Sequence, residues 1–286
     1  MNYYLVFLII IIITYIFISK ILKLKNKDII FLNVAFIEML LFLGLRDTTI
    51  GIDLQNYIPY FNIINGLSLD NLFYLPLEKG YVILNRLVGI VGGENVFLFV
   101  VAFISLFGVY YSIKKYSKNY MLSVFIYITF QFYIFIFSGL RQGIAFSIVW
   151  LSLKYVKERK LVKFVLMVLL ATMFHKTALI FLPVYFLANK RITLKYVLIF
   201  LGVFISISIL KVELVSFVTR FLYSAYEVSA STGGYTLLAL LFAVFMFFVL
   251  IRNKKTDNFR DNDVWFNMLM IAILIQTLAS TQGNIA

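Results

Sequence analysis

The stretch NYYLVFLIIIIITYIFISKILKLKNK, residues 2–27, decides the fold of this chain. An almost unbroken apolar run ends in the lysines Lys20, Lys23, Lys25 and Lys27. Roughly 20 apolar residues in a helix span the hydrocarbon layer of a bilayer, and lysines at one end mark the cytoplasmic side. No charge precedes the run and no small-residue cleavage site follows it, so we predict a retained membrane helix rather than a signal peptide.

Similar apolar runs recur to the end of the chain. Of 286 residues, 63% are hydrophobic and only 14% are charged. The runs are apolar on all sides rather than alternating, which favours helices over the strands of a membrane barrel. Because we find no internal repeat and no linker to a soluble domain, we predict one integral membrane domain over 1–286, an all-α, polytopic transmembrane helical bundle. Spanning helices are expected at 3–22, 29–45, 95–112, 120–137, 143–156, 197–210, 235–251 and 264–281.

The distribution of basic residues sets the expected topology. The net charge of +13 could indicate a nucleic-acid partner, but most Lys and Arg fall in short clusters between apolar runs, which is the positive-inside pattern. We therefore expect no nucleic acid, and we expect a multi-pass protein of the cell membrane. The clusters lie within 20–27, 114–118, 154–163, 190–195 and 252–260.

All of these clusters can be cytoplasmic only if two segments do not cross the membrane fully. Residues 78–93 carry charges and glycines, and we predict an interfacial or re-entrant element there. Residues 161–189 have room for two short legs, so we predict a re-entrant or short-helix hairpin with its apex outside. The N-terminus is then external, and two extracytoplasmic polar loops are expected at about 46–94 and 211–234.

Several basic residues lie on the expected external side, against the positive-inside trend. They are Arg46, Arg141, Lys176 and Arg220, beside the only histidine, His175. Arg141 stands in a turn of small residues that opens a helix, where the helix N-terminus and the guanidinium both favour a phosphate group. The alternative is structural, because Arg141 could instead pair with an external carboxylate such as Asp53 or Glu78.

The imidazole of His175 is the candidate general acid or base, because its unperturbed pKa lies near neutral pH. The adjacent ammonium of Lys176 is expected to lower that pKa and to favour the neutral form. The alternative is a hydrogen-bonded amphipathic side chain at the interface, just as Arg46 could be a snorkelling side chain. Glu38 lies within a predicted spanning helix and would suit a transporter, but it lacks the further buried acids of a proton relay.

Absent motifs narrow the chemistry. The chain has no cysteine and one histidine, which excludes disulfides, thiolate metal sites and a His-cluster metal site. The sequence contains no P-loop, no G-x-G-x-x-G fingerprint, no H-E-x-x-H and no G-x-S-x-G elbow. We therefore expect no metal and no cofactor, and a substrate that is lipid-linked, extracytoplasmic and anionic.

Four short motifs over about 46–183 are each weak alone but fairly specific together. They are Arg46-Asp47-x-x-x-Gly51-x-Asp53-x-x-x-Tyr57, Glu78-Lys79-Gly80-Tyr81-x-x-Leu84-Asn85, Gly139-x-Arg141-Gln142-x-x-Ala145 and Phe174-His175-x-x-Ala178-x-x-x-Leu182-Pro183. In this order and at these spacings the chain resembles the EpsG family, which belongs with the Wzy-like polysaccharide polymerases of bacterial envelopes.

The resemblance implies a glycosyltransferase of the lipid-dependent GT-C type, without a nucleotide sugar. It would join oligosaccharide repeat units carried on undecaprenyl diphosphate, at the outer face of the membrane, in exopolysaccharide or capsule biosynthesis. Expected partners are this lipid-linked oligosaccharide, the bilayer, and other assembly proteins such as a flippase and a chain-length regulator. The expected catalytic residues are Arg141, His175 and Asp53. The expected substrate-binding residues are Arg46, Asp47, Tyr57, Glu78, Tyr81, Gln142, Lys176 and Arg220.

The resemblance also implies a further motif with an arginine and aromatic residues after the last helix. The chain stops at Ala286 without it, so truncation at the C-terminus is an open alternative. Two other function classes also stay open. A transporter or flippase of the lipid-linked oligosaccharide would need functional charges near the midplane, where only Glu38 is found. A membrane O-acyltransferase acting on polysaccharide would need a second buried polar group near His175 and a cytoplasmic route for the acyl donor.

Overall fold

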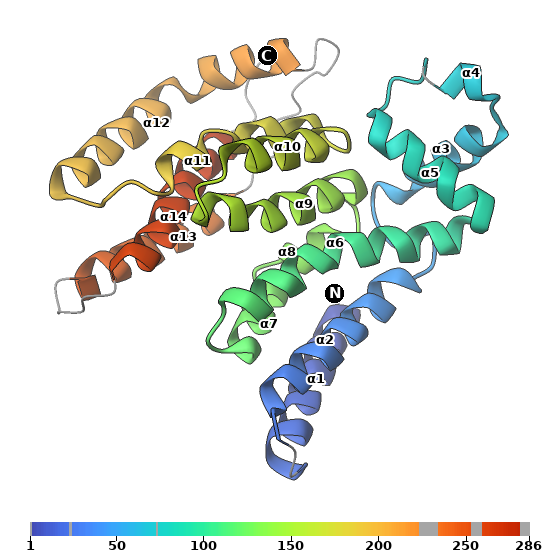
Figure 1. The fold of residues 1–286 in the computed structure, drawn as a ribbon, viewed down its shortest axis with the longest axis horizontal. Helices are drawn as coiled ribbons and strands as arrows, with labels where there is room; N and C mark the ends of the chain where they lie inside the picture. The colour runs from blue at the N-terminus through green and yellow to red at the C-terminus, as the bar shows by residue number, and fades with distance from the viewer. Residues whose placement is uncertain (1, 23–24, 73, 223–233, 253–258, 281–286) are drawn as a thin grey trace. The chain divides into compact units, whose positions relative to one another are not determined.

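The computed structural model describes residues 2–22, 25–72, 74–222, 234–252 and 259–280. Over these ranges every regular element is a helix, as the sequence predicted (Figure 1). The chain divides into two compact units: the first consists of Met1–Lys154 with Val162–Leu179, and the second of Tyr155–Leu161 with Ile180–Ala286. Each unit is described by itself, and the expectation of a single membrane domain stays a prediction.

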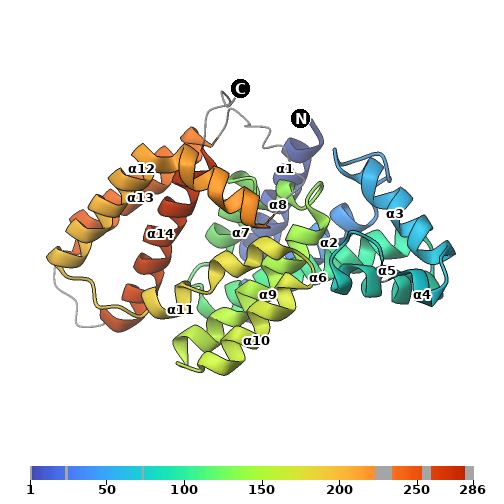
Figure 2. The same ribbon diagram turned by 90° about the horizontal axis from the view of Figure 1, so that it is seen from above.

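The first unit contains the N-terminal helices, the first three motifs and the 174–178 part of the fourth motif. Its elements are α1 (Asn2–Ile16), the π-helical turn η1 (Phe17–Ile21), α2 (Lys27–Gly44), α3 (Leu54–Gly66), α4 (Leu69–Leu72), α5 (Lys79–Val91), α6 (Glu94–Tyr116), α7 (Tyr120–Thr129), α8 (Phe132–Phe135), most of α9 (Leu140–Lys157), α10 (Leu161–Thr172) and the start of the 3-10 turn η2 (Lys176–Phe181). Figure 2 shows α3, α4 and α5 grouped together in this unit.

Helix α2 is the centre of the first unit and packs against α1, α6 and α7. Between lipid-embedded helices there is little hydrophobic driving force, so close contact of small residues and interdigitated rings holds them together. Phe7 of α1 stacks on Tyr133 at 5.3 Å between ring centroids. Where α6 meets α9, the amide of Gly108 donates to Ser147 Oγ at 2.8 Å, and a Cβ at position 108 would collide with the Ser147 backbone.

Helices α2 and α6 run antiparallel, which separates the two ends of the first unit. The first turn of α2 faces the turn between α6 and α7. At the other end Gly44 closes on Phe99 near the start of α6, where an added Cβ would lie 2.8 Å from the ring. The 18 residues of α2 cover about 27 Å. The lysine-rich segments before α2 and after α6 therefore lie at one end of this unit and Arg46 at the other, while the side of the membrane that each end faces stays a prediction.

The second unit contains α11 (Val184–Leu187), α12 (Leu194–Leu222), α13 (Tyr235–Arg252) and α14 (Phe259–Ala279). Helix α14 packs against both α12 and α13, around a core that includes Phe245 and Phe266. The fully buried Asn267 of α14 donates its Nδ2 to the carbonyls of Ala188 at 2.9 Å and Lys190 at 2.7 Å. These bonds satisfy two carbonyls that the end of α11 would otherwise leave unpaired.

Three helices in the described part of the chain are long and apolar enough to cross a membrane, over Tyr4–Ile21, Glu94–Tyr116 and Leu194–Phe217. Shorter apolar helices accompany them in both units. Only 6% of the apolar window of α12 is buried, and such a large exposed apolar face is typical of a surface that lipid covers. These features fit a membrane helical bundle.

The two segments expected as extracytoplasmic loops are largely helical where the structure describes them. Helix α3 buries Leu54, Tyr57, Phe61 and Ile64, whose three- and four-residue spacing is the apolar stripe of an amphipathic helix. The sequence did not predict this helix, because the asparagines on the other face of α3 hid that stripe, while the extracytoplasmic position of the segment stays a prediction. In the segment 211–234, residues 211–222 continue α12, and residues 223–233 lie outside the described part.

The expected helix 120–137 is interrupted between α7 and α8. Gln131 adopts a left-handed conformation with φ 65°, and the amide of Phe130 closes the last turn of α7 on Ile126. The chain then turns back into the core of the first unit, where the hydroxyl of Tyr133 donates to the Met39 carbonyl at 2.7 Å. The segment 161–189 forms α10, η2 and α11, and His175 lies in the turn between α10 and η2. The placement of this segment in the membrane stays a prediction.

Candidate functional site

A close backbone contact assembles the candidate site. At the start of α5, the amides of Gly80 and Tyr81 donate to the Met173 carbonyl at 2.9 and 3.3 Å. A Cβ at position 80 would lie 2.8 Å from both the Cβ and the carbonyl oxygen of Met173. Only glycine therefore lets these two segments touch. The contact brings Glu78, which immediately precedes α5, to the turn that carries His175.

Glu78, Arg141 and His175 form one cluster, although they come from three separate motifs. Arg141 Nη1 donates to Glu78 Oε2 at 2.5 Å, and His175 Nδ1 lies 3.8 Å from Glu78 Oε1. The side chains of Glu78, His175 and Arg141 are 7%, 13% and 22% exposed. The carboxylate thus faces a guanidinium with one oxygen and an imidazole with the other, in a site that excludes most water.

Two tyrosine rings surround the guanidinium of Arg141. Its Cζ lies 5.6 Å from the ring centroid of Tyr57 in α3 and 5.8 Å from that of Tyr81 in α5. The two rings also contact each other edge to face at 5.9 Å, and both are buried. Cation–π contacts of this kind are strongest where water is excluded. Tyr57 and Tyr81 therefore contact Arg141 in this structure, and their expected role in substrate binding stays a prediction.

Arg46 is buried, and it pairs with no carboxylate among the described residues. It is 8% exposed, and its Cζ lies 4.9 Å from the ring centroid of Phe137. Among the residues that the structure describes, no hydrogen bond or ion pair to its guanidinium is found, and its Nε is buried without a partner. Burial lowers the pKa of Arg46 to about 10, an effect that the hydroxyls of Tyr133 and Tyr4 partly oppose. Arg46 nevertheless remains a cation at neutral pH.

The segment after Arg46 lies on the turn that leads to Arg141. The amide of Ile52 donates to Ser138 Oγ at 3.1 Å. Gly51 has a φ of 130°, and a Cβ there would collide with the Phe137 carbonyl. The first and third motifs are thus joined through residues 137–138. No direct contact of Arg46 with Glu78, Arg141 or His175 is found within the described ranges.

The electrostatics of the cluster favour a neutral imidazole. Burial is the largest effect and lowers the pKa of His175 below its usual value; Glu78 raises it and Arg141 lowers it. The sequence assigned the lowering to Lys176, but that side chain is exposed and burial dominates. Nδ1 of His175 has no hydrogen-bond partner within the described residues. The imidazole can therefore accept a proton near neutral pH.

Other predicted site residues lie outside this cluster. Asp47 and Asp53 are exposed; the carboxylate of Asp47 accepts hydrogen bonds from Thr49, which lower its pKa, and Asp53 precedes the first turn of α3. Gln142 is half-buried in α9. The backbone of Arg220 belongs to α12 in the second unit, and its side chain lies outside the described residues.

Glu38 belongs to α2, and its side chain faces α1, away from this cluster. Thr14 Oγ1 donates to its Oε1 at 2.6 Å, while Oε2 is buried and has no partner in the described part of the chain. No group of three or more metal-ligating side chains occurs among the described residues. The sequence named Glu78 as a possible partner of Arg141 and as a substrate-binding residue, but it did not predict that the Glu78 carboxylate would lie between Arg141 and His175.

The model of the EpsG family matches residues 29–286, nearly the whole chain. The chain belongs to the EpsG family. Membership confirms the resemblance carried by the four motifs and places the protein, at the family level, among the Wzy-like polysaccharide polymerases. Together with its apolar helices, it identifies this EpsG-family chain as a multi-pass membrane protein. No curated protein and no solved structure matches the chain.

Proposed function

We propose that this EpsG-family protein is a glycosyltransferase that polymerises oligosaccharide repeat units carried on undecaprenyl diphosphate. It acts at the outer face of the cytoplasmic membrane in exopolysaccharide or capsule biosynthesis. The observation that carries the proposal is the convergence of Glu78, Arg141 and His175 in one buried cluster, joined through residues 137–138 to the segment of Arg46. Cleavage of a sugar–diphosphate bond needs an anion-binding group and a base, and this end of the first unit supplies candidates for both.

Arg46 supplies the anion-binding group in this proposal. A buried charge without a partner costs several kcal/mol, so a buried guanidinium that lacks a counter-ion favours a bound anion. The diphosphate of the substrate gains negative charge as the glycosidic bond breaks. A fixed, desolvated guanidinium stabilises that charge by a few kcal/mol. Arg141, whose Nε also lacks a partner among the described residues, is assigned to the same leaving group.

His175 supplies the base. Because Glu78 faces Nδ1, we assign the proton of the neutral ring to Nδ1 and leave Nε2 as the acceptor. Nε2 takes the proton from the acceptor sugar hydroxyl as its oxygen bonds to the anomeric carbon. The bond from that carbon to the diphosphate breaks, and the lipid diphosphate leaves with the electron pair. Glu78 then stabilises the imidazolium, as a buried carboxylate does beside other catalytic histidines.

The decisive experiment is chain extension in vitro, with the purified protein and synthetic undecaprenyl-diphosphate repeat units. The native protein is expected to form polymer, and Arg141→Ala is expected to leave single lipid-linked repeats at an unchanged protein level. Arg191→Ala, at an exposed arginine outside the cluster, is the matched control and should extend chains normally.

Two outcomes contradict the proposal. Normal polymer from Arg141→Ala removes that residue from the chemistry. Repeats that accumulate only on the inner leaflet of cells lacking the protein indicate a flippase instead, since a polymerase defect leaves them on the outer leaflet.

A further inference from the structure

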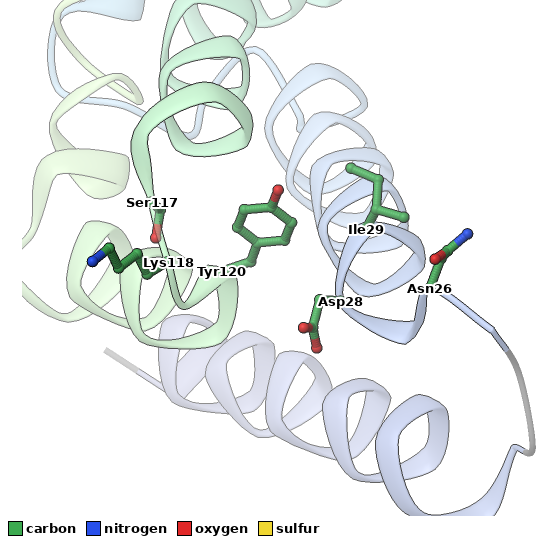
Figure 3. Close-up of a pocket in the computed structure, with 6 residues that line it drawn as sticks. All are labelled: Asn26, Asp28, Ile29, Ser117, Lys118 and Tyr120. Carbon is green, nitrogen blue, oxygen red and sulfur yellow. The ribbon is translucent and has the colours of Figure 1, made fainter.

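A cavity lies at the end of the first unit that is remote from Arg46, between the first turn of α2 and the turn from α6 to α7 (Figure 3). Its volume is about 270 Å³. A second cavity of about 130 Å³ shares part of its lining and reaches Tyr15 of α1. The residues that line the larger cavity are Asn26, Asp28, Ile29, Ser117, Lys118 and Tyr120.

One carboxylate and one ammonium line both cavities. Asp28 and Lys118 are exposed, and within the described ranges neither makes a hydrogen bond or an ion pair, either with the other or with a third residue. In Figure 3 the two side chains point away from each other, with the ammonium of Lys118 on the side remote from Asp28. The hydroxyl of Tyr120, by contrast, is already bonded to the Lys114 carbonyl at 3.2 Å. The cavity therefore offers a ligand two opposite charges that do not neutralise each other.

The cavity lies where apolar helices end. The turn η1 ends at Ile21, α2 begins at Lys27, α6 ends at Tyr116 and α7 begins at Tyr120. In a spanning protein this is the level of the lipid head groups. Phe31 and Met121 add apolar wall to the smaller cavity. Lysine-rich segments flank the cavity on both sides, and such segments attract phosphate groups at the membrane surface.

We propose that this cavity binds the head group of a zwitterionic phospholipid that carries a phosphate and a primary amine. Lys118 takes the phosphate, and Asp28 takes the ammonium by a charge-assisted hydrogen bond. A purely anionic head group would leave Asp28 without a partner and beside a like charge. A quaternary amine has no N–H to donate to the carboxylate. The site is separate from the candidate polymerase cluster, so it does not depend on the proposed reaction.

The test is lipid binding to the delipidated, detergent-purified full chain, followed by native mass spectrometry. The probes are phosphatidylethanolamine, phosphatidylglycerol and phosphatidylcholine with identical acyl chains. The native protein is expected to bind phosphatidylethanolamine at least about fivefold more tightly than the other two, which corresponds to about 1 kcal/mol. Asp28→Asn should abolish the preference over phosphatidylglycerol, and Lys118→Gln should weaken both lipids.

Asp70→Asn is the matched control, because Asp70 is an exposed aspartate in α4 that lines neither cavity. It should keep the native preference. Equal binding of the three lipids by the native protein overturns the proposal, and this result needs no variant to fold. A preference that survives Asp28→Asn also overturns it. Competition by soluble phosphoethanolamine as effective as the intact lipid would show a site for a free ligand, not for a lipid.

Discussion

Replacing Glu78 by glutamine removes the carboxylate that faces the only histidine of the chain, and the charge on that histidine can be measured directly. Glu78 Oε1 lies 3.8 Å from His175 Nδ1. At this distance a carboxylate stabilises an imidazolium by about 1 kcal/mol in bulk water and about 4 kcal/mol at an effective dielectric constant near 20. The imidazole is 13% exposed, so the larger value is the nearer one.

The sign of the effect follows from the neighbours. Burial lowers the pKa of His175, Glu78 opposes this effect, and Arg141 reinforces it. Glu78→Gln removes the opposing charge and leaves the repulsion by Arg141, so the pKa should fall further. Even the lower value of about 1 kcal/mol corresponds to about a fivefold change, since 1.4 kcal/mol is a factor of ten. At a fixed pH the fraction of imidazolium should therefore drop at least about fivefold.

The assay is NMR titration of protein labelled only in histidine, where the ring carbon and nitrogen shifts report the protonation state. A single histidine removes any ambiguity of assignment. Asp47→Asn removes the same charge from an exposed position and should leave the titration unchanged. If His175 titrates identically in native protein and in Glu78→Gln, the carboxylate does not act on the imidazole and the assignment of Glu78 is wrong.

Three further substitutions test the remaining parts of the site and the fold. Arg46→Gln should reduce chain extension about 10²-fold or more at an unchanged protein level, since a fixed charge at the leaving group is worth a few kcal/mol. Unchanged extension would show that Arg46 does not bind the leaving group. Gly80→Val should separate α5 from the turn of the only histidine and shift its NMR signals, whereas Gly66→Ala, which has open space around it, should not. Gly108→Val should lower the midpoint of thermal unfolding in detergent, because the Ser147 backbone fills the space and overpacking costs about 1–3 kcal/mol; an unchanged midpoint would contradict the close crossing of α6 and α9.

Acidification provides a test of the native protein. The pKa of His175 is lowered from the usual value of 6.5. A base must be unprotonated, so polymerisation should persist at neutral pH and fall only as the pH drops below 6.5, with the acidic limb of the pH–rate profile set by His175. Glu78→Gln should move that limb to lower pH. A limb that stays in place in this variant would point to a base other than His175.

The helices could be predicted where apolar composition alone determines them. Long apolar runs with lysines at their ends predicted α1 together with η1, α2 and α6 to within about four residues. Helix α3 was missed because its stripe of four buried residues is interleaved with asparagines, and α7 ends early through a left-handed residue that leaves no composition signal. Local patterns thus predict elements well, but not where a polar amphipathic helix packs.

The candidate site was predicted in its members more than in its arrangement. Guanidinium and imidazole groups placed against the charge trend identified Arg46, Arg141 and His175, and the ion pair of Arg141 with Glu78 was one of two named alternatives. That Glu78 also faces His175 depends on the contact of Gly80 with Met173, which joins segments far apart in the sequence. The sequence likewise could not show that Arg46 is buried against the Phe137 ring, with no hydrogen bond or ion pair to the described residues.

The joint between α5 and the histidine turn is made by main-chain atoms alone. Its donors are two amides and its acceptor is a carbonyl, and Met173 as a residue is 42% exposed. Substitutions at residue 173 should therefore leave the contact between α5 and the turn of His175 intact, whereas position 80 tolerates no side chain. Among members of the EpsG family, this contact predicts an invariant glycine at the position of Gly80 and a variable residue at the position of Met173.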